Sequence, residues 1–471
     1  MPDNSKQTNF LRMHQHSTDP EWYVKLGSPT KGLAPMVDGS ELPYRLLTRR
    51  YNVELSWTPM YNTNTLVMSP KAMTQLVDEL KYGESIDRPL VLQLSGNNPS
   101  NFELAYSTLV QMGAGCCFDI VELNMGCPQA VALRGKYGSY LMEHLELAEE
   151  ILHTLVAATT RFGLGHKVAV KTRLETSSKD TLKMCLRLCN TGIAMFTLHG
   201  RTRLQRTGSA VGPPNWQMLA SVLKDLRASY PHLIFFANGG VWNLETHERL
   251  RSLTGCHGTM SASMLTENAG VYSCRNGLNE KSLTITNLAC AISEHWVDQQ
   301  EVQRRLAMNQ SLQKCVYVTN KAVQEHPLDA PMHADLIKTW IVPPEEAEKS
   351  IIKVQLAERS LEQRRNRIIL ALEYLLIARD MPAFVTVSQL TSHVMRLIGR
   401  DLAAANVDLR QKITIESREN IWDTPTNKQE GDHPITRMCN TLLEAVCELY
   451  YRVDNSVCCI SSTGSLRTAS G

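Results

Sequence analysis

Short apolar runs rich in β-branched residues recur through the first 265 residues, and segments with helical periodicity lie between them. Most runs are nearly continuous rather than alternating, which is typical of strands buried on both faces. The predicted strands are Gly32–Val37, Val53–Met60, Pro89–Ser95, Phe118–Met125, Lys167–Leu174, Ala194–Gly200, Leu233–Gly239 and Gly258–Met264. The predicted helices are Ser69–Tyr82, Pro99–Met112, Ser139–Arg161, Lys179–Thr191, Trp216–Tyr230 and Leu244–Leu253. This alternation predicts an α/β fold, a (β/α)8 TIM barrel. A doubly wound sheet competes with it, but no G-x-G-x-x-G segment follows the first strand.

The pattern changes near Leu283, after which helical periodicity continues to about Leu409 without a convincing strand. The predicted helices here are Ala322–Trp340, Pro344–Ile377 and Ser388–Ala404, with a last amphipathic helix over Ile435–Val453. We therefore expect a flexible N-terminal extension (1–28), a barrel (29–282), an all-helical domain (283–453) with a loop at about 411–434, and a flexible tail (454–471).

Capping residues mark several of the predicted helix starts. Ser69 precedes a proline at the first helical position, and Asn215 precedes Trp216. Pro344 is followed by two glutamates, whose charge favours the N-terminal end of a helix dipole.

Composition narrows the class of protein. With 471 residues, 43% of them hydrophobic, the chain can bury a large core, which excludes wholesale disorder. We expect no membrane span, because no run approaches 18 apolar residues, and no secretory signal, because Asp3 and Asp19 flank an N-terminus without an apolar region. The net charge of +2 means that any basic surface must be local.

The 13 cysteines include no C-x2-C pair, so neither a zinc ribbon nor a ferredoxin-type cluster is suggested. The adjacent pairs Cys116-Cys117 and Cys458-Cys459 do not have a usual metal-ligand spacing. We expect mostly reduced, buried thiols, a cytoplasmic location and no bound metal.

Polar residues and glycines follow the predicted strands, and in such a barrel the strand ends form the active site. With the apolar residues beside them, the candidate site residues are Pro35, Met36, Gln93, Asn124, Cys127, Lys171, Arg173, His199, Arg201, Asn238, Gly239, Gly240, Ser261 and Ala262. The small residues after the last two strands suit a phosphate bound by backbone N–H groups. The positive charge of Lys171 suits an electron-rich ring. The side-chain amides of Gln93 and Asn124 can donate hydrogen bonds to a heteroaromatic ring and accept them from it. Together these groups predict a flavin mononucleotide (FMN) site.

The same residues carry a resemblance to a known family. Leu123-Asn124-Met125-Gly126-Cys127-Pro128-Gln129, followed by Arg134-Gly135-Lys136-Tyr137-Gly138, resembles the signature of tRNA-dihydrouridine synthases. Further motifs follow in the family's order: Ala34-Pro35-Met36-Val37, Val170-Lys171-Thr172-Arg173, Leu198-His199-Gly200-Arg201-Thr202 and Ala237-Asn238-Gly239. The Gly-Cys-Pro-Gln form is most similar to the eukaryotic branch that acts on positions 16 and 17 of the D-loop. The resemblance covers roughly Lys31 to Trp340.

The resemblance implies that NADPH reduces FMN, that hydride passes from flavin N5 to C6 of a tRNA uridine, and that Cys127 protonates C5. It places FMN against Pro35, Met36, Gln93, Lys171, His199, Asn238, Gly239, Gly240, Ser261 and Ala262. It places the uridine and the tRNA against Asn124, Arg134, Lys136, Arg201, Arg203 and Lys338, with Arg206 nearby. The helical domain would grip tRNA, and Arg364-Arg365-Asn366-Arg367 would be either an RNA contact or a solvated face. We expect a monomer.

Two other hypotheses remain open at this point. The chain departs from the family pattern at Gly240 and Val241 and again at Ser263-Met264, all near the expected phosphate site. Those changes would suit a non-catalytic RNA-binding paralogue that has lost flavin. A flavin barrel that reduces a free pyrimidine is the second alternative, but it leaves the helical domain unexplained.

Overall fold

The computed structural model describes residues 19–205, 212–272 and 361–399, together with residues 406, 411, 433–443, 445, 446 and 449. It divides the chain into two compact units, Met1–Leu265 with Gly270–Tyr272, and Thr266–Ala269 with Ser273–Gly471. The helix predicted over Ala322–Trp340, the start predicted at Pro344, the domain boundary predicted at 282 and the tail predicted over 454–471 lie outside the described residues.

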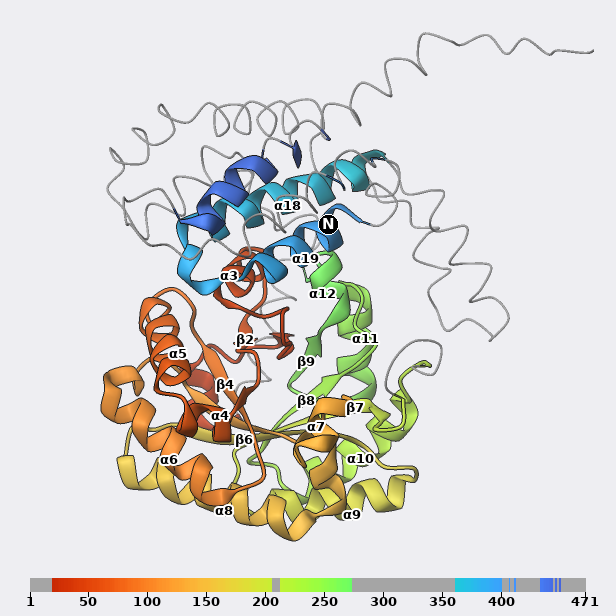
Figure 1. Ribbon diagram of the computed structural model, residues 1–471. Helices are drawn as coiled ribbons and strands as arrows, with labels where there is room; N and C mark the ends of the chain where they lie inside the picture. The colour runs from red at the N-terminus through yellow and green to blue at the C-terminus, as the bar shows by residue number, and fades with distance from the viewer. Residues whose placement is uncertain are drawn as a thin grey trace, which may run out of the picture. The chain divides into compact units, whose positions relative to one another are not determined.

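The first unit is built on a closed parallel barrel (Figure 1). Its strands are β1 (Lys31–Leu33), β2 (Leu55–Trp57), β4 (Leu90–Ser95), β5 (Ile120–Asn124), β6 (Lys167–Leu174), β7 (Met195–Thr202), β8 (Ile234–Asn238) and β9 (Gly258–Ser261). Each pairs in parallel with its neighbour, β1 pairs with β9, and the pairing of β2 with β4 completes the ring. A short extra strand, β3 (Tyr61–Asn62), pairs with the carboxyl end of β4. The predicted TIM barrel is thus confirmed, and the doubly wound alternative is wrong.

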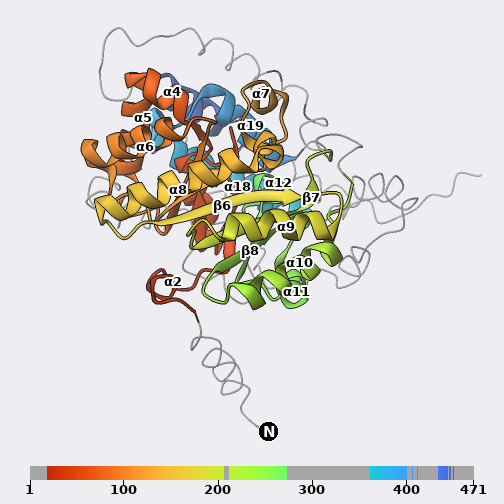
Figure 2. The same cartoon turned by 90° about the horizontal axis from the view of Figure 1, so that it is seen from below.

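The helices that connect the strands form the outer layer, and the turned view shows α8 to α11 outside β6, β7 and β8 (Figure 2). They are α5 (Pro70–Tyr82), α6 (Pro99–Leu109), α8 (Leu145–Phe162), α9 (Ser178–Cys189), α10 (Trp216–Ser229) and α11 (Leu244–Thr254). The two predicted caps are confirmed: Ser69 accepts from the backbone N–H of Ala72, and Asn215 accepts from that of Met218. Each side chain satisfies one of the unpaired N–H groups of a helix start.

Alternation along the strands separates two cores. One face of each strand packs against the helices, and Leu92, Leu123 and Val170 belong to this outer core. The other face fills the barrel interior, where Val91, Ile120 and Ala169 meet Trp57 and other large side chains. Because the side-chain period of a strand is two, residues 93, 122, 124 and 171 also face the interior, above this apolar floor.

Several elements differ from the predicted pattern. The helices α3 (Leu42–Arg50), α4 (Thr63–Met68) and α7 (Ala130–Arg134) were not predicted, and the first two strands are shorter than their apolar runs. The predicted flexible extension holds a short helix, α2 (Glu21–Lys25). Its Tyr23 is buried in the interior cluster with Leu55 and Ile120, so residues 19–28 are part of the packed barrel.

The second unit is helical where it is described. Its elements include α18 (Leu361–Asp380) and α19 (Val387–Ile398), and Thr386 forms a capping box with Gln389 at the start of α19. Arg367 donates from α18 to the carbonyl oxygens of Arg396 and Leu397, at the end of α19. Arg367 therefore caps a helix end. Among the described residues, no helix is long and apolar enough to cross a membrane.

Candidate active site

The predicted strand-end residues meet at the carboxyl end of the barrel. Strand register places Asn124 beside Lys171, Arg173 beside His199, and His199 beside Asn238. These side chains come from four neighbouring strands, β5 to β8, and they face the interior above the apolar floor. The structure therefore brings together on one rim the residues that the sequence placed at separate strand ends.

A chain of hydrogen bonds runs through the amides of this rim. Asn124 Oδ1 accepts from the backbone N–H groups of Gly126 at 3.1 Å and Cys127 at 3.0 Å. Asn124 Nδ2 donates to Gln93 Oε1 at 2.7 Å, and Gln93 Nε2 donates to Glu122 Oε1 at 2.7 Å. A buried carboxylate thus connects through two buried amides to the backbone of Cys127.

Cys127 is half-buried in the loop after β5. Gly138 packs directly on this loop: a Cβ at Gly138 would lie 2.7 Å from the carbonyl oxygen of Cys127 and 3.0 Å from its Cβ. The backbone N–H of Ser139 donates to the same carbonyl at 3.0 Å, and Arg173 Nε donates to that of Gly126 at 2.6 Å. The backbone of the Cys127 loop is therefore held by these contacts, and the two motifs of the signature form one local structure.

Glu122 is a candidate site residue that the sequence did not predict. Its side chain is fully buried, and Oε2 has no hydrogen-bond partner among the described residues. Burial raises the pKa of Glu122 to about 7, although the hydrogen bond from Gln93 and the charge of Lys171 oppose the shift. The sequence did offer a signal for this residue. Side chains alternate between the two faces of a strand, so Glu122, two positions before Asn124, lies on the same face of β5 as Asn124.

Cationic side chains are crowded beside this chain. Burial and the charge of the nearby Arg173 lower the pKa of Lys171 to about 8. Burial and the charge of Arg201 lower the pKa of Arg173 to about 10. Burial, Arg173 and Lys171 hold the pKa of His199 well below its ordinary value.

No carboxylate among the described residues pairs with these cations. Arg173 donates to the backbone carbonyls of Gly126 and Thr202, and Arg201 Nε donates to that of Gly212. Glu122 and the thiolate form of Cys127 act on Lys171 through their charge and raise its pKa, against the effect of burial. The rim therefore has an excess of half-buried positive charge, which a bound anion would relieve.

The residues after β8 and β9 have the geometry of a backbone cradle. Asn238 and Ser261, the last residues of β8 and β9, donate from their side chains to the carbonyls of Met260 and Val241, which fixes the two strand ends. Gly239 and Gly240 have φ values of +105° and +78°. A Cβ at Gly240 would lie 2.8 Å from Pro214 Cγ, so this backbone accepts glycine where the family pattern has a larger residue.

The apolar side of the rim comes from residues that follow β1, β2 and β9. Pro35, Met36, Met60 and Ala262 are partly accessible. The sulfur of Met60 lies 3.6 Å from Asn124 Nδ2, which places this methionine at the site rather than only in the core.

The predicted tRNA contacts are more scattered. Arg134 and Lys136 are exposed at and after the end of α7, in the turn before Gly138. Arg203 is not free at the rim, because it forms an ion pair with Glu143. Lys338 and Arg206 lie outside the described residues.

The comparisons with known proteins agree with the motifs. The family model described as Dihydrouridine synthase (Dus) matches residues 32–338. A tRNA-dihydrouridine(16/17) synthase [NAD(P)(+)] of Saccharomyces cerevisiae is 35% identical over 283 residues, which cover 60% of this chain and 63% of the relative. Its namesake in Schizosaccharomyces pombe is 33% identical over 242 residues, covering 51% and 57%. A tRNA-dihydrouridine(20a/20b) synthase [NAD(P)+] of S. cerevisiae is 30% identical over 273 residues, covering 56% and 70%.

The match thus spans less than two thirds of the length of the first two relatives. Among solved structures, an old yellow enzyme homologue from Zymomonas mobilis aligns with 51% of this chain and 86% of its own, at 9% identity and a TM-score of 0.37. The family model covers more than half of the chain, including each strand of the barrel and the rim. The chain belongs to the dihydrouridine synthase family.

Proposed function

We propose that this protein is a flavin-dependent tRNA-dihydrouridine synthase, which reduces a uridine of tRNA at its 5,6 double bond. The observation that carries the proposal is the cluster of half-buried cations, Lys171, Arg173 and Arg201, beside the half-buried thiol of Cys127. An anionic cofactor over this rim would relieve that charge. The thiol would then lie beside the ring of a pyrimidine that stacks on the cofactor.

The residues of the rim fit FMN. The backbone after β8 and β9 would hold its phosphate, with His199 beside Gly239, where the glycine Cβ position is 3.3 Å from His199 Cε1. Lys171 would lie at the pyrimidine end of the ring, where its charge favours the reduced form. FMN-binding residues would be Pro35, Met36, Gln93, Lys171, His199, Asn238, Gly239, Gly240, Ser261 and Ala262. When bound, FMN supplies the hydride that reaches C6 of the uracil.

The protein's own part is to place the uracil and to supply a proton. Cys127 would donate the proton of its thiol to C5, and solvent would replace it. Asn124 would contact the uracil, and its side chain also fixes the Cys127 loop through the backbone N–H of Cys127. Arg201 would hold the flipped nucleotide.

The names of the relatives support a choice of substrate and reductant. Two relatives are named for tRNA positions 16 and 17, and their names include NAD(P)(+). We infer that the substrate is a D-loop uridine, that NADPH is the reductant, and that the protein acts in the cytoplasm as a monomer. Arg134, Lys136, Arg203 and Lys338 would contact the tRNA backbone, together with the helical unit. Affinity should then fall as salt rises, because bound phosphates release counterions.

One experiment separates this proposal from its alternatives. The purified full chain is mixed with FMN, NADPH and unmodified tRNA, flavin binding is followed by absorbance, and dihydrouridine is mapped along the tRNA. The expected result is a bound flavin and dihydrouridine in the D-loop. A chain that binds tRNA but no flavin would be the non-catalytic paralogue. A flavoprotein that reduces free uracil or uridine, and leaves tRNA unmodified, would be the free-pyrimidine enzyme.

A further inference from the structure

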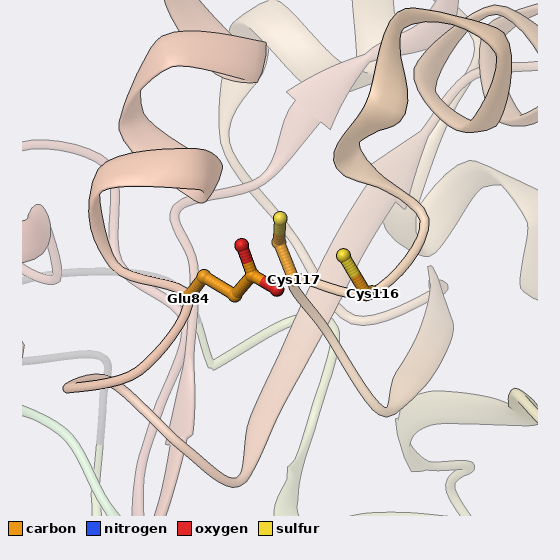
Figure 3. A group of neighbouring side chains, drawn as sticks. All are labelled: Glu84, Cys116 and Cys117. Atoms are coloured by element: carbon orange, nitrogen blue, oxygen red, sulfur yellow. The ribbon is translucent and has the colours of Figure 1, made fainter.

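Two cysteines and a glutamate lie together at the end of the barrel opposite the active site. Glu84 follows α5, whereas Cys116 and Cys117 follow the π-helical turn Val110–Ala114 and precede β5. The two thiol sulfurs and a carboxylate oxygen all lie within 4.8 Å of one another. Figure 3 shows the carboxylate of Glu84 reaching from its own segment toward the cysteines. Because these segments precede β4 and β5, the group lies at the amino ends of the strands, away from Cys127.

A cavity of about 620 Å³ gives access to this group. Its polar and charged lining comprises Glu84, Ser85, Cys116 and Asp119 together with Lys25, Lys81 and Arg88. Cys116 is exposed, against the expectation that cysteines other than Cys127 are buried, and Cys117 is buried beneath it. An ion from solvent can therefore reach the exposed sulfur and the carboxylate without a change in the core.

Three cationic residues, Lys25, Lys81 and Arg88, line the same cavity, but none of them forms an ion pair with Glu84 in the part of the chain that the structure describes. Arg88 lies nearby, but its guanidinium pairs with Asp119 and also donates to the carbonyl of Cys116. A divalent cation would bind each sulfur as thiolate, the form that binds metal.

We propose that Glu84, Cys116 and Cys117 form a zinc-class metal site that lies outside the catalytic machinery. Two sulfur ligands and one carboxylate oxygen suit Zn²⁺ or Cd²⁺, with water as the fourth ligand. A tetrahedral zinc site holds its sulfurs roughly 3.8 Å apart, given Zn–S bonds of about 2.3 Å, so small rotations of the side chains complete the site. Each thiol loses its proton as its sulfur–metal bond forms, and nothing is oxidised or reduced.

Such an ion would tie together two segments that are distant in the sequence. The segment after α5 and the segment before β5 would share one ligand sphere, on the face of the barrel that contributes to stability rather than to catalysis. The spacing of the cysteines did not predict this metal site, because the third ligand, Glu84, comes from another part of the chain. Metal binding would stabilise the folded barrel by mass action.

The test uses the purified full chain, reduced and freed of metal with a chelator. Cd²⁺ is titrated in, the ultraviolet charge-transfer band of cadmium thiolate reports binding, and Zn²⁺ competition and thermal unfolding follow. Glu84→Gln and Cys116→Ser alter accessible ligands, and Cys117→Ser alters the buried one. Cys256→Ser is the matched control, because that thiol is buried elsewhere and its hydrogen bond to the carbonyl of Gly258 is one that serine can keep.

The expected result is one Cd²⁺ per chain, displaced by Zn²⁺, with a raised melting temperature. Each ligand variant should weaken binding by roughly tenfold or more, and the control should bind as the wild type does. If Cys117→Ser fails to fold, the two accessible variants decide the question. Wild-type protein that binds no ion, or ligand variants that bind as tightly as the control, would overturn the proposal.

Discussion

Replacing Glu122 with glutamine should flatten the dependence of barrel stability on pH. The carboxyl is fully buried, and burial raises its pKa from an ordinary 4.5 to about 7. Between those values the folded chain keeps a proton that the unfolded chain has already released. The free energy of unfolding of the wild type therefore falls as pH rises from about 4.5 to about 7, and then levels off.

The size of this effect follows from the shift. Moving a carboxyl pKa from 4.5 to about 7 corresponds to at most about 3 kcal/mol of unfolding free energy. Glutamine has nearly the same shape and can still accept from Gln93 through its own Oε1, so the interior packing is kept. The variant should thus gain up to about 3 kcal/mol relative to the wild type between pH 5 and pH 7.5.

Urea unfolding at half-unit steps from pH 5 to pH 8 measures this difference. The difference between variant and wild type is compared at each pH, so that the contribution of the helical unit cancels. Glu150→Gln, the same substitution at an exposed position of α8, controls for the loss of one carboxylate. A Glu122→Gln variant whose stability follows the wild-type pH profile would refute the raised pKa and the buried charge behind it.

Three further predictions concern the rim and its surroundings. Cys127→Ala should keep bound flavin and lose uridine reduction by roughly a hundredfold or more, because a general acid is removed; normal turnover with tRNA would contradict its role. Gly240→Ala should destabilise the barrel by roughly 1–3 kcal/mol, because alanine at φ +78° is strained and its Cβ would lie 2.8 Å from Pro214 Cγ; an unchanged melting temperature would contradict the strain. Arg203→Ala should change unfolding by less than about 1 kcal/mol, because its ion pair with Glu143 is partly exposed, while tRNA affinity in a filter-binding assay should fall if Arg203 contacts phosphate.

Much of the barrel could be predicted from the sequence because its signals are local. The apolar run over Lys167–Leu174 coincides with β6, and Ser69 and Asn215 cap the helices that they precede. The helix α3 could not be predicted, because its burial depends on distant partners. Arg45 is fully buried there, since Glu79 and Asp87 of later segments neutralise it.

The site was predictable to the extent that strand ends converge in this fold. That rule correctly placed Gln93, Asn124, Lys171 and His199 on one rim without any knowledge of their contacts. The rule says nothing about which charged side chains form ion pairs, so the ion pair between Arg203 and Glu143 was not predicted. It also gave no reason to choose a glutamate inside an apolar run.

The buried glutamate has a consequence for the whole rim, because a carboxylate can only accept hydrogen bonds. Gln93 must therefore turn its Nε2 toward Glu122, which leaves Oε1 for Asn124. Asn124 must in turn present Nδ2 to Gln93, which leaves Oδ1 for the backbone of Cys127. Two amides that could each face either way thus have one orientation. A protonated Glu122 could donate instead, so the pKa near 7 couples the order of the cysteine loop to pH.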